Sequence, residues 1–315
     1  MANRTLNVAI VLAATIATFA LIIGCDDATG PGTEFGHAEL IYELISDDMY
    51  NIRLADVSLD GDMYILRTYN YETKERGLWY LEPAEGEPFV IGEDTTSWWG
   101  SPKLSPDKEN VVYQEKSGIY VVPVAGGEPR RIYGQGLDPT ATQWLDDDTV
   151  LMYVLEGRWD INTIDVNTLE VNTLLTVVEA DVWFTYLSPD GKHLFVGGDA
   201  PEPGNPDDYY HLFRIYDTET WEYEEYIIGE DGIDYVPSGP WSPDGTKIAI
   251  SAMSKQRTYL GYFDLATSDE KMFFSSYKLL FNGLYKAIWS PDGRHFLASE
   301  ERDDNILRVF AVDVE

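Results

Sequence analysis

Histidines are the residues of this sequence best suited to acid–base or metal chemistry, because imidazole titrates near neutral pH and is a common metal ligand. The chain has four of them, His37, His193, His211 and His295. His193 and His295 each follow the serine of a repeated turn by five residues, so they occupy equivalent positions in two repeat units and are predicted to be structural. The motifs of serine hydrolases, zinc proteases, phosphate-binding loops and EF-hand calcium loops are not found in the sequence. We therefore predict no catalytic residues and no metal ligands.

Acidic side chains dominate the composition. Among 315 residues, 55 are Asp or Glu and 22 are Lys or Arg, which gives a formal net charge of −33. Such a surface repels nucleic-acid phosphates, so nucleic acid is not an expected partner. Acidic clusters at residues 146–148, 207–208 and 300–304 are interpreted as parts of a solvated surface, and no cofactor is expected. One weakly bound calcium ion is the alternative, since converging carboxylate oxygens are its usual ligands.

Aromatic residues in irregular segments are the candidates for a binding face. They are Trp98, Trp99, Trp183, Tyr235 and Tyr285, which we place in connections on one side of the molecule. Aromatic side chains on loops that face water commonly hold peptides or sugars. The alternative is that they pack inside the protein. A proline-rich insertion at residues 198–210 is expected to be a surface loop on the same side.

A repeated turn sets the positions of all these residues. Four clear copies of Ser-Pro-Asp follow a Leu or Trp, and two degenerate copies complete the series. The first turn residues are at positions 58, 105, 145, 188, 242 and 290, at steps of 47, 40, 43, 54 and 48 residues. Ser and Asp accept backbone hydrogen bonds in tight turns, Pro presets its φ, and Gly suits the turn exit. The spacing indicates six units of similar structure.

Each turn is followed by an apolar run of strand length, and further strand-like runs precede the next turn. Four short strands per unit without helical periodicity predict an all-β fold, a six-bladed β-propeller of four-stranded antiparallel blades. The sixth unit has no fourth strand after residues 306–314, whereas an extra run at residues 39–45 precedes the first unit. We predict that this N-terminal strand completes the last blade and so closes the ring.

The turn followed by an apolar strand resembles the WD-like repeat of the TolB propeller and of the propellers attached to prolyl-oligopeptidase-type and tricorn peptidases. The resemblance covers residues 38–315. It implies the fold, but such propellers perform many tasks. Residues 26–37 are too few for the α/β domain of TolB or for a hydrolase domain, so neither Tol partnership nor peptidase activity is expected to carry over.

The first 24 residues contain one charge and a long apolar run that ends in Leu-Ile-Ile-Gly before Cys25. This pattern is typical of an export signal and resembles the lipobox of bacterial lipoproteins, in which Cys25 would be lipidated. The expected organisation is a signal peptide (1–24), a flexible tether (25–37) and a propeller (38–315). An uncleaved membrane helix is the alternative, and it would also tether the protein.

Two functions are consistent with these features. The first is a non-catalytic lipoprotein of the bacterial cell envelope, anchored by lipid to the membrane and facing the periplasm or the exterior, whose propeller binds a protein or peptide. The second is a propeller enzyme, a lyase or lactonase acting on sugar acids through an axial metal site. Carboxylate, His or Gln side chains converging at the axis would favour the enzyme, whereas aromatic and neutral polar residues there would favour the binding module.

Overall fold

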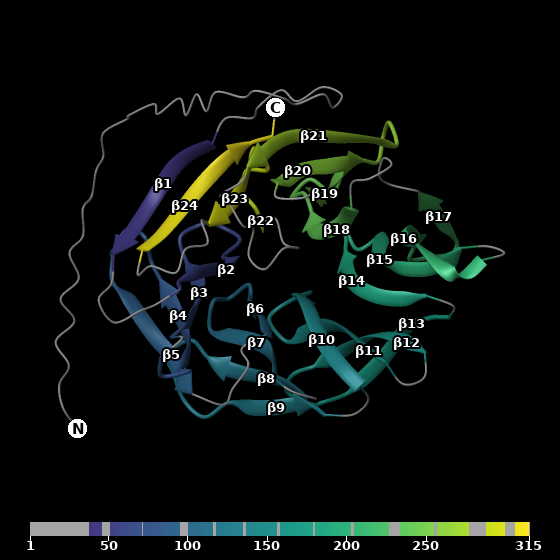
Figure 1. The fold of residues 1–315 in the computed structure, drawn as a ribbon. Helices are drawn as coiled ribbons and strands as arrows, with labels where there is room; N and C mark the ends of the chain where they lie inside the picture. The colour runs from purple at the N-terminus through teal and green to yellow at the C-terminus, as the bar shows by residue number, and fades with distance from the viewer. Residues whose placement is uncertain are drawn as a thin grey trace.

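The computed structural model describes residues 38–45, 51–70, 72–94, 100–115, 118–134, 137–155, 158–178, 180–202, 205–226, 234–254, 257–276, 288–299 and 306–314. Within these ranges the chain forms six four-stranded antiparallel sheets arranged around a common axis (Figure 1). The predicted six-bladed β-propeller is therefore confirmed. Residues 1–37, which include the predicted signal, Cys25 and the whole predicted tether, lie outside the described residues. None of the described segments is a helix with the length and apolar character needed to cross a bilayer.

The strands follow one another outward from the axis in each of the first five blades. Blade 1 contains β2 (Arg53–Val57), β3 (Tyr64–Tyr69), β4 (Arg76–Leu81) and β5 (Pro88–Asp94). Blade 2 contains β6 (Gly100–Leu104), β7 (Asn110–Glu115), β8 (Gly118–Pro123) and β9 (Arg130–Tyr133). Blade 3 contains β10 (Leu137–Trp144), β11 (Thr149–Leu155), β12 (Trp159–Asp165) and β13 (Val171–Val177).

Blade 4 contains β14 (Asp181–Leu187), β15 (His193–Glu202), β16 (Asn205–Asp217) and β17 (Tyr223–Tyr226). Blade 5 contains β18 (Asp234–Trp241), β19 (Lys247–Ser254), β20 (Arg257–Asp264) and β21 (Asp269–Ser276). Blade 6 combines β22 (Ile288–Trp289), β23 (His295–Ser299) and β24 (Ile306–Asp313) with β1 (Ala38–Ile45), which is the outermost strand of that blade.

The two ends of the chain close the ring. Strand β1 pairs antiparallel with β24 from Ala38↔Val312 to Ile45↔Ile306, and the two lie side by side in Figure 1. The side chains of Arg308 and Glu43 add an ion pair of 3.0 Å across this junction. The predicted pairing of the N-terminal strand with the last blade is confirmed.

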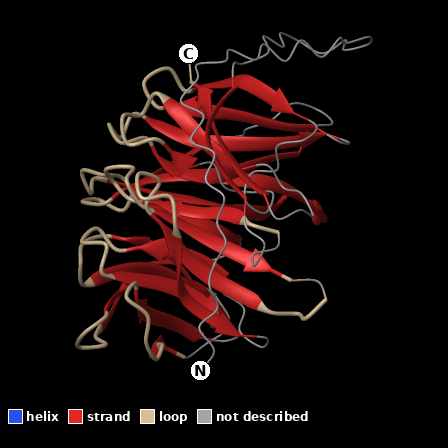
Figure 2. Ribbon diagram, turned by 90° about the vertical axis from the view of Figure 1, so that its left-hand side faces the viewer, coloured by secondary structure: helices blue, strands red, loops and turns tan. Residues whose placement is uncertain are grey.

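The repeated turns form a regular set on one face, along the left edge of Figure 2. In five of them the serine hydroxyl donates to the aspartate two residues later at 2.5 to 2.7 Å. The same hydroxyl accepts the backbone N–H five residues later at 2.9 to 3.0 Å. His193 and His295 supply that N–H in their blades and begin β15 and β23, so their predicted equivalent placement is confirmed.

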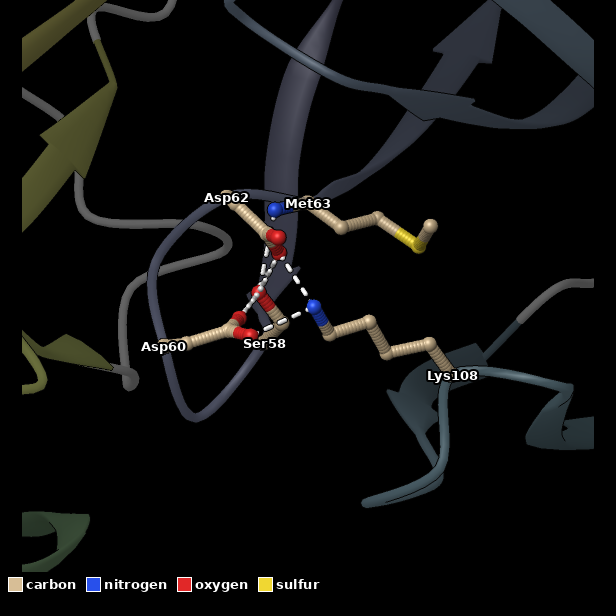
Figure 3. A network of polar contacts seen from close by, with 5 residues as sticks. All are labelled: Ser58, Asp60, Asp62, Met63 and Lys108. Atoms are coloured by element: carbon tan, nitrogen blue, oxygen red, sulfur yellow. Dashed lines mark hydrogen bonds and ion pairs between the residues drawn. The ribbon is translucent and has the colours of Figure 1, made fainter.

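The second turn makes an additional contact with the first (Figure 3). Lys108 stands at the exit of the second turn, where most other copies have glycine, and it has a φ of 64°. Its Nζ atom lies 2.5 Å from Asp60 and 2.6 Å from Asp62 of the first turn. The Lys108 ammonium, followed by the Ser58 hydroxyl, holds the pKa of Asp60 well below its usual range. Two neighbouring blades are thus linked by charge at this point.

Buried side chains join the blades to one another. Trp144, Trp241 and Trp289, which precede three of the turns, are each no more than 7% exposed. Their indole N–H groups donate to backbone carbonyls of the preceding blades, those of Lys103, Tyr186 and Pro240. Since a buried indole N–H normally needs a partner, each tryptophan both fills space and fixes the angle between two blades.

Several segments that we expected to be irregular are strands. Residues 198–202 and 205–210 extend the β15–β16 hairpin, which remains paired out to Glu202↔Asn205 instead of forming a loose loop. Trp183 and Tyr235 likewise belong to β14 and β18, not to loops. Glycine and proline obscure the strand pattern in the sequence, but cross-strand backbone pairing outweighs that local signal.

Candidate functional site

Trp183 is the only residue of the predicted binding face whose side chain the structure describes. It lies near the start of β14, the innermost strand of blade 4, and its side chain is 38% exposed. Tyr235 is at the corresponding end of β18 in blade 5, where its backbone pairs with Ala252. Trp98, Trp99 and Tyr285 lie outside the described residues. The described part of the face therefore centres on Trp183.

Trp183 is the extra residue of a β-bulge. Val182 pairs with Gly198 and Phe184 pairs with Gly197, so Trp183 has no partner of its own on β15. Bulges redirect a side chain out of the regular alternation of a strand. Bulges in blades 1 and 3 occur three residues before the turn, at Ala55 and Thr142, and bury these small residues. Among the inner strands that the structure describes at this position, those of blades 1 to 5, only that of blade 4 has its bulge five residues before the turn, and it exposes a large aromatic side chain there.

Two contacts hold the bulge in place. A Cβ atom at Gly198 would lie 1.8 Å from the carbonyl oxygen of Asp181, so no other residue fits opposite this part of β14 without a shift. The hydroxyl of Tyr153, in blade 3, donates to the carbonyl of Trp183 at 2.6 Å. This bond satisfies a backbone group at the bulged residue. Glycine spacing and an interblade hydrogen bond therefore fix the backbone of Trp183.

Carboxylate and imidazole groups lie beside Trp183 on the strands of blade 4. Asp181, Asp199 and His211 are directly opposite one another on β14, β15 and β16. The ring of His211 lies 6.2 Å from that of Trp183 in an edge-on arrangement, and its Nδ1 atom is 2.9 Å from Asp199 Oδ1. On the blade 3 side, the indole N–H of Trp159 donates to Asp181 Oδ1 at 3.2 Å. We call Trp159, Asp181, Trp183, Asp199 and His211 the Trp183 cluster.

The strand that carries His211 is braced from outside. Arg214 on β16 pairs with Glu225 on β17 at 2.6 Å, and the Tyr210 hydroxyl donates to the same carboxylate at 3.0 Å. Burial, followed by the hydrogen bond to Glu225, raises the pKa of Tyr210, so the phenol stays protonated as a donor. These contacts join β16 to β17 on either side of His211 in sequence.

Sequence reasoning found Trp183 but missed Asp181, Asp199 and His211 as its neighbours. The available signal was the pair Gly197-Gly198 inside a strand, a pattern that indicates a bulge or a close backbone approach. Asp181 pairs with Asp199 on a different strand, and no local sequence motif predicts this pairing.

The acidic clusters have different outcomes. Residues 146–148 form a degenerate turn, in which Asp146 accepts the backbone N–H groups of Asp148 and Thr149. This agrees with the prediction that a degenerate copy of the repeated turn begins at residue 145. The side chains of residues 207–208 and the whole of 300–304 lie outside the described part. Among the described residues no three His, Cys, Asp or Glu side chains are grouped as metal ligands. The calcium alternative stays a prediction.

A hollow with a volume of about 540 Å³ lies between blades 2 and 3. It is lined by β9, β12 and β13, and its polar wall includes Asp160 and Asn162. Asp160 accepts a hydrogen bond from Thr176 at 2.5 Å and lies 3.5 Å from Arg158. Both contacts are made by Asp160 Oδ1, and the Arg158 guanidinium balances the charge of this carboxylate.

Comparison with known proteins identifies the architecture. No family profile matches the sequence, and no characterised protein matches it by sequence. Among solved structures, TolB from Acinetobacter baumannii superposes with a TM-score of 0.57 and 16% identity, covering 72% of this chain and 56% of that one. The chain thus spans little more than half the length of that protein. The putative TolB from Agrobacterium tumefaciens has the same TM-score and identity, with 83% and 90% covered.

An oligogalacturonate lyase determined in complex with manganese is equally similar in shape. Its TM-score is 0.58 at 10% identity, with 89% of this chain and 98% of that chain covered. At such identities the likeness concerns the fold alone, which confirms that part of the resemblance to TolB seen in the repeats. The chain has a TolB-like six-bladed β-propeller fold.

Proposed function

We propose that this protein is a lipid-anchored module of the bacterial cell envelope whose propeller binds a protein or an extended peptide without catalysing a reaction. The observation that carries the proposal is the presentation of Trp183. An aromatic side chain is exposed at a bulge. Gly198 allows the close backbone approach at this bulge, and Tyr153 of blade 3 donates a hydrogen bond to it. A rigid, exposed aromatic group contributes binding area at little cost in conformational entropy.

The likeness to the two TolB propellers supports this proposal only through the shared fold. The lipobox-like sequence at Cys25 supports the anchor and the envelope location, on either the periplasmic or the exterior side. Replacing Cys25 by Ser tests the anchor. The variant should move from the membrane fraction to the soluble fraction, and a variant retained in the membrane would favour the uncleaved helix.

Site-specific photo-crosslinking in cells tests the binding face. A photoreactive aromatic residue in place of Trp183 should give a discrete crosslinked species that depends on light. The matched control is Phe89, an aromatic residue 43% exposed on β5, the outer strand of blade 1. The same pattern at both positions, or no crosslink at position 183, would contradict the proposal.

A second candidate is a sugar-acid lyase or lactonase with an axial metal. The observation that favours it is the fold similarity to the manganese-bound lyase over nearly the whole chain. Its test is to incubate the full-length protein with manganese and oligogalacturonate and to follow the ultraviolet absorbance of an unsaturated product. Turnover that chelator abolishes would replace the binding proposal with this one.

A further inference from the structure

We propose that the Trp183 cluster binds the guanidinium group of an arginine carried by an extended segment of a partner protein. This inference rests on the proposed binding function and adds the chemistry of the ligand. A guanidinium is a planar cation that stacks on an aromatic face and donates hydrogen bonds in its own plane. Its ideal site therefore combines an exposed indole with carboxylates beside it.

The indole is in place before any ligand arrives. Gly198 admits the close approach of the Asp181 carbonyl, and the Tyr153 hydroxyl holds the carbonyl of Trp183. The ring of His211 lies edge-on to the indole at 6.2 Å, and the indole remains 38% exposed. Little ordering of this side chain is needed on binding, which lowers the entropic cost.

The carboxylates retain their capacity to accept hydrogen bonds. Asp181 Oδ1 accepts from the indole of Trp159, and Asp199 Oδ1 contacts His211. Among the described contacts their Oδ2 atoms have no partner. The basic residues of blade 4 pair elsewhere, Lys192 with Asp190 at 3.7 Å and Arg214 with Glu225 at 2.6 Å. A cation from outside is the group that this arrangement lacks.

The charge of the whole molecule favours the same ligand. At a net charge of −33 the protein attracts basic segments and repels acidic or phosphorylated ones. The side chain of arginine is preferred to that of lysine here, because a guanidinium can stack and donate to two carboxylates together.

The test is a titration of the full-length protein in non-ionic detergent, followed by NMR of its nine indole N–H signals. The Trp183 signal is assigned by its loss in Trp183→Phe. The probes are a short glycine-arginine peptide and the same peptide with citrulline, which has the shape of arginine but no charge. The arginine peptide should shift the Trp183 signal saturably, and citrulline should weaken binding by about tenfold or more.

Variants of the two aspartates test whether their negative charge is needed for binding. Asp181→Asn and Asp199→Asn should each weaken the arginine peptide by about tenfold, since a charged acceptor becomes a neutral one. Asp147→Asn removes an equal charge from an exposed turn of blade 3 and should leave the affinity unchanged. Circular dichroism verifies that each variant is folded.

The outcomes separate this inference from the proposed function. Equal binding of the arginine and citrulline peptides, or an unchanged affinity in both Asp variants, would overturn the arginine site. If crosslinking at position 183 nevertheless persists, the binding module stands with a different ligand. If the arginine peptide binds as expected while crosslinking fails, the site stands and the protein-binding function is wrong.

Discussion

The face that carries the repeated turns, which we call the turn face, differs from the Trp183 cluster in its contacts, although the same inner strands contribute to both. At the turn face, each serine bonds to residues two and five positions away, and the arrangement recurs from blade to blade. At the cluster, one blade shifts its bulge by two residues, and the contacts join segments far apart in sequence. Repetition thus accompanies stability, whereas the departure from repetition marks the site that we propose to be functional.

Replacing a tryptophan by alanine should lower the stability of the protein strongly at the turn face and only slightly at the Trp183 cluster. This is the largest difference that we predict. Trp241→Ala removes a side chain that is 5% exposed together with its bond to the Tyr186 carbonyl at 2.9 Å. We expect a loss of about 3–5 kcal/mol in the free energy of unfolding, measured with urea.

Trp183→Ala is the matched comparison. Its side chain is partly exposed, so the free energy of unfolding should change by less than about 1 kcal/mol, while the affinity for the glycine-arginine peptide should fall. Equal destabilisation by the two variants would show that the division between a structural and a binding region is wrong.

The bulge should depend on one glycine. Gly198→Ala places a Cβ atom 1.8 Å from the Asp181 carbonyl, and relief of this clash should cost about 1–3 kcal/mol. The control is Gly191→Ala, where φ is +72° and no atom lies within 4 Å, so only backbone strain of about 1 kcal/mol is expected. The shift of the Trp183 indole signal should change in the first variant only.

Strand β14 also contains a buried hydroxyl. Thr185 is fully buried, and its Oγ1 atom has no hydrogen-bond partner among the described residues. Thr185→Val keeps the shape and removes the unsatisfied group, so the free energy of unfolding should rise by about 1 kcal/mol. Thr142→Val removes a hydroxyl that bonds to the Leu151 carbonyl and should be destabilising instead. A loss of stability in Thr185→Val would contradict this account of β14.

Acid should weaken the turn face. The hydroxyl of Ser290 and the backbone N–H of Arg294 hold the pKa of Asp292 below its usual value. Its carboxylate therefore contributes stability above the unfolded pKa of about 3.9, and this contribution is lost as the pH falls through the folded pKa. Asp292→Asn should lower the melting temperature at pH 7, and its difference from the native protein should close below about pH 4. Asp147→Asn should show no such convergence.

The charged link between the first two turns should have the smallest effect. Lys108→Asn removes the cation but keeps a residue type that tolerates a φ of 64°. The melting temperature should fall slightly at low ionic strength and recover the native value in about 1 M salt, where charges are screened within about 3 Å. A difference that persists in high salt would mean that Lys108 acts through packing.

Much of the architecture followed from the sequence because its determinants are local. The turns need only a serine, an aspartate and a permissive exit residue within five positions, so their spacing was sufficient to predict six blades. The closure by β1 followed from the missing fourth strand of the last blade, since a sheet edge without a partner needs one. The equivalent positions of His193 and His295 in their blades could also be predicted, because each depends only on the distance from a turn.

The sequence by itself determined the ring and its turns, and it left open whether Trp183 is exposed or packs inside the protein. Only the tertiary structure decided that Trp183 stands at a bulge, that Gly198 and Tyr153 hold it, and that Asp199 and His211 lie beside it. The physical reason is the range of the interactions. A turn is stabilised by hydrogen bonds between near neighbours, whereas a bulge depends on how two strands register and on what the next blade donates to it.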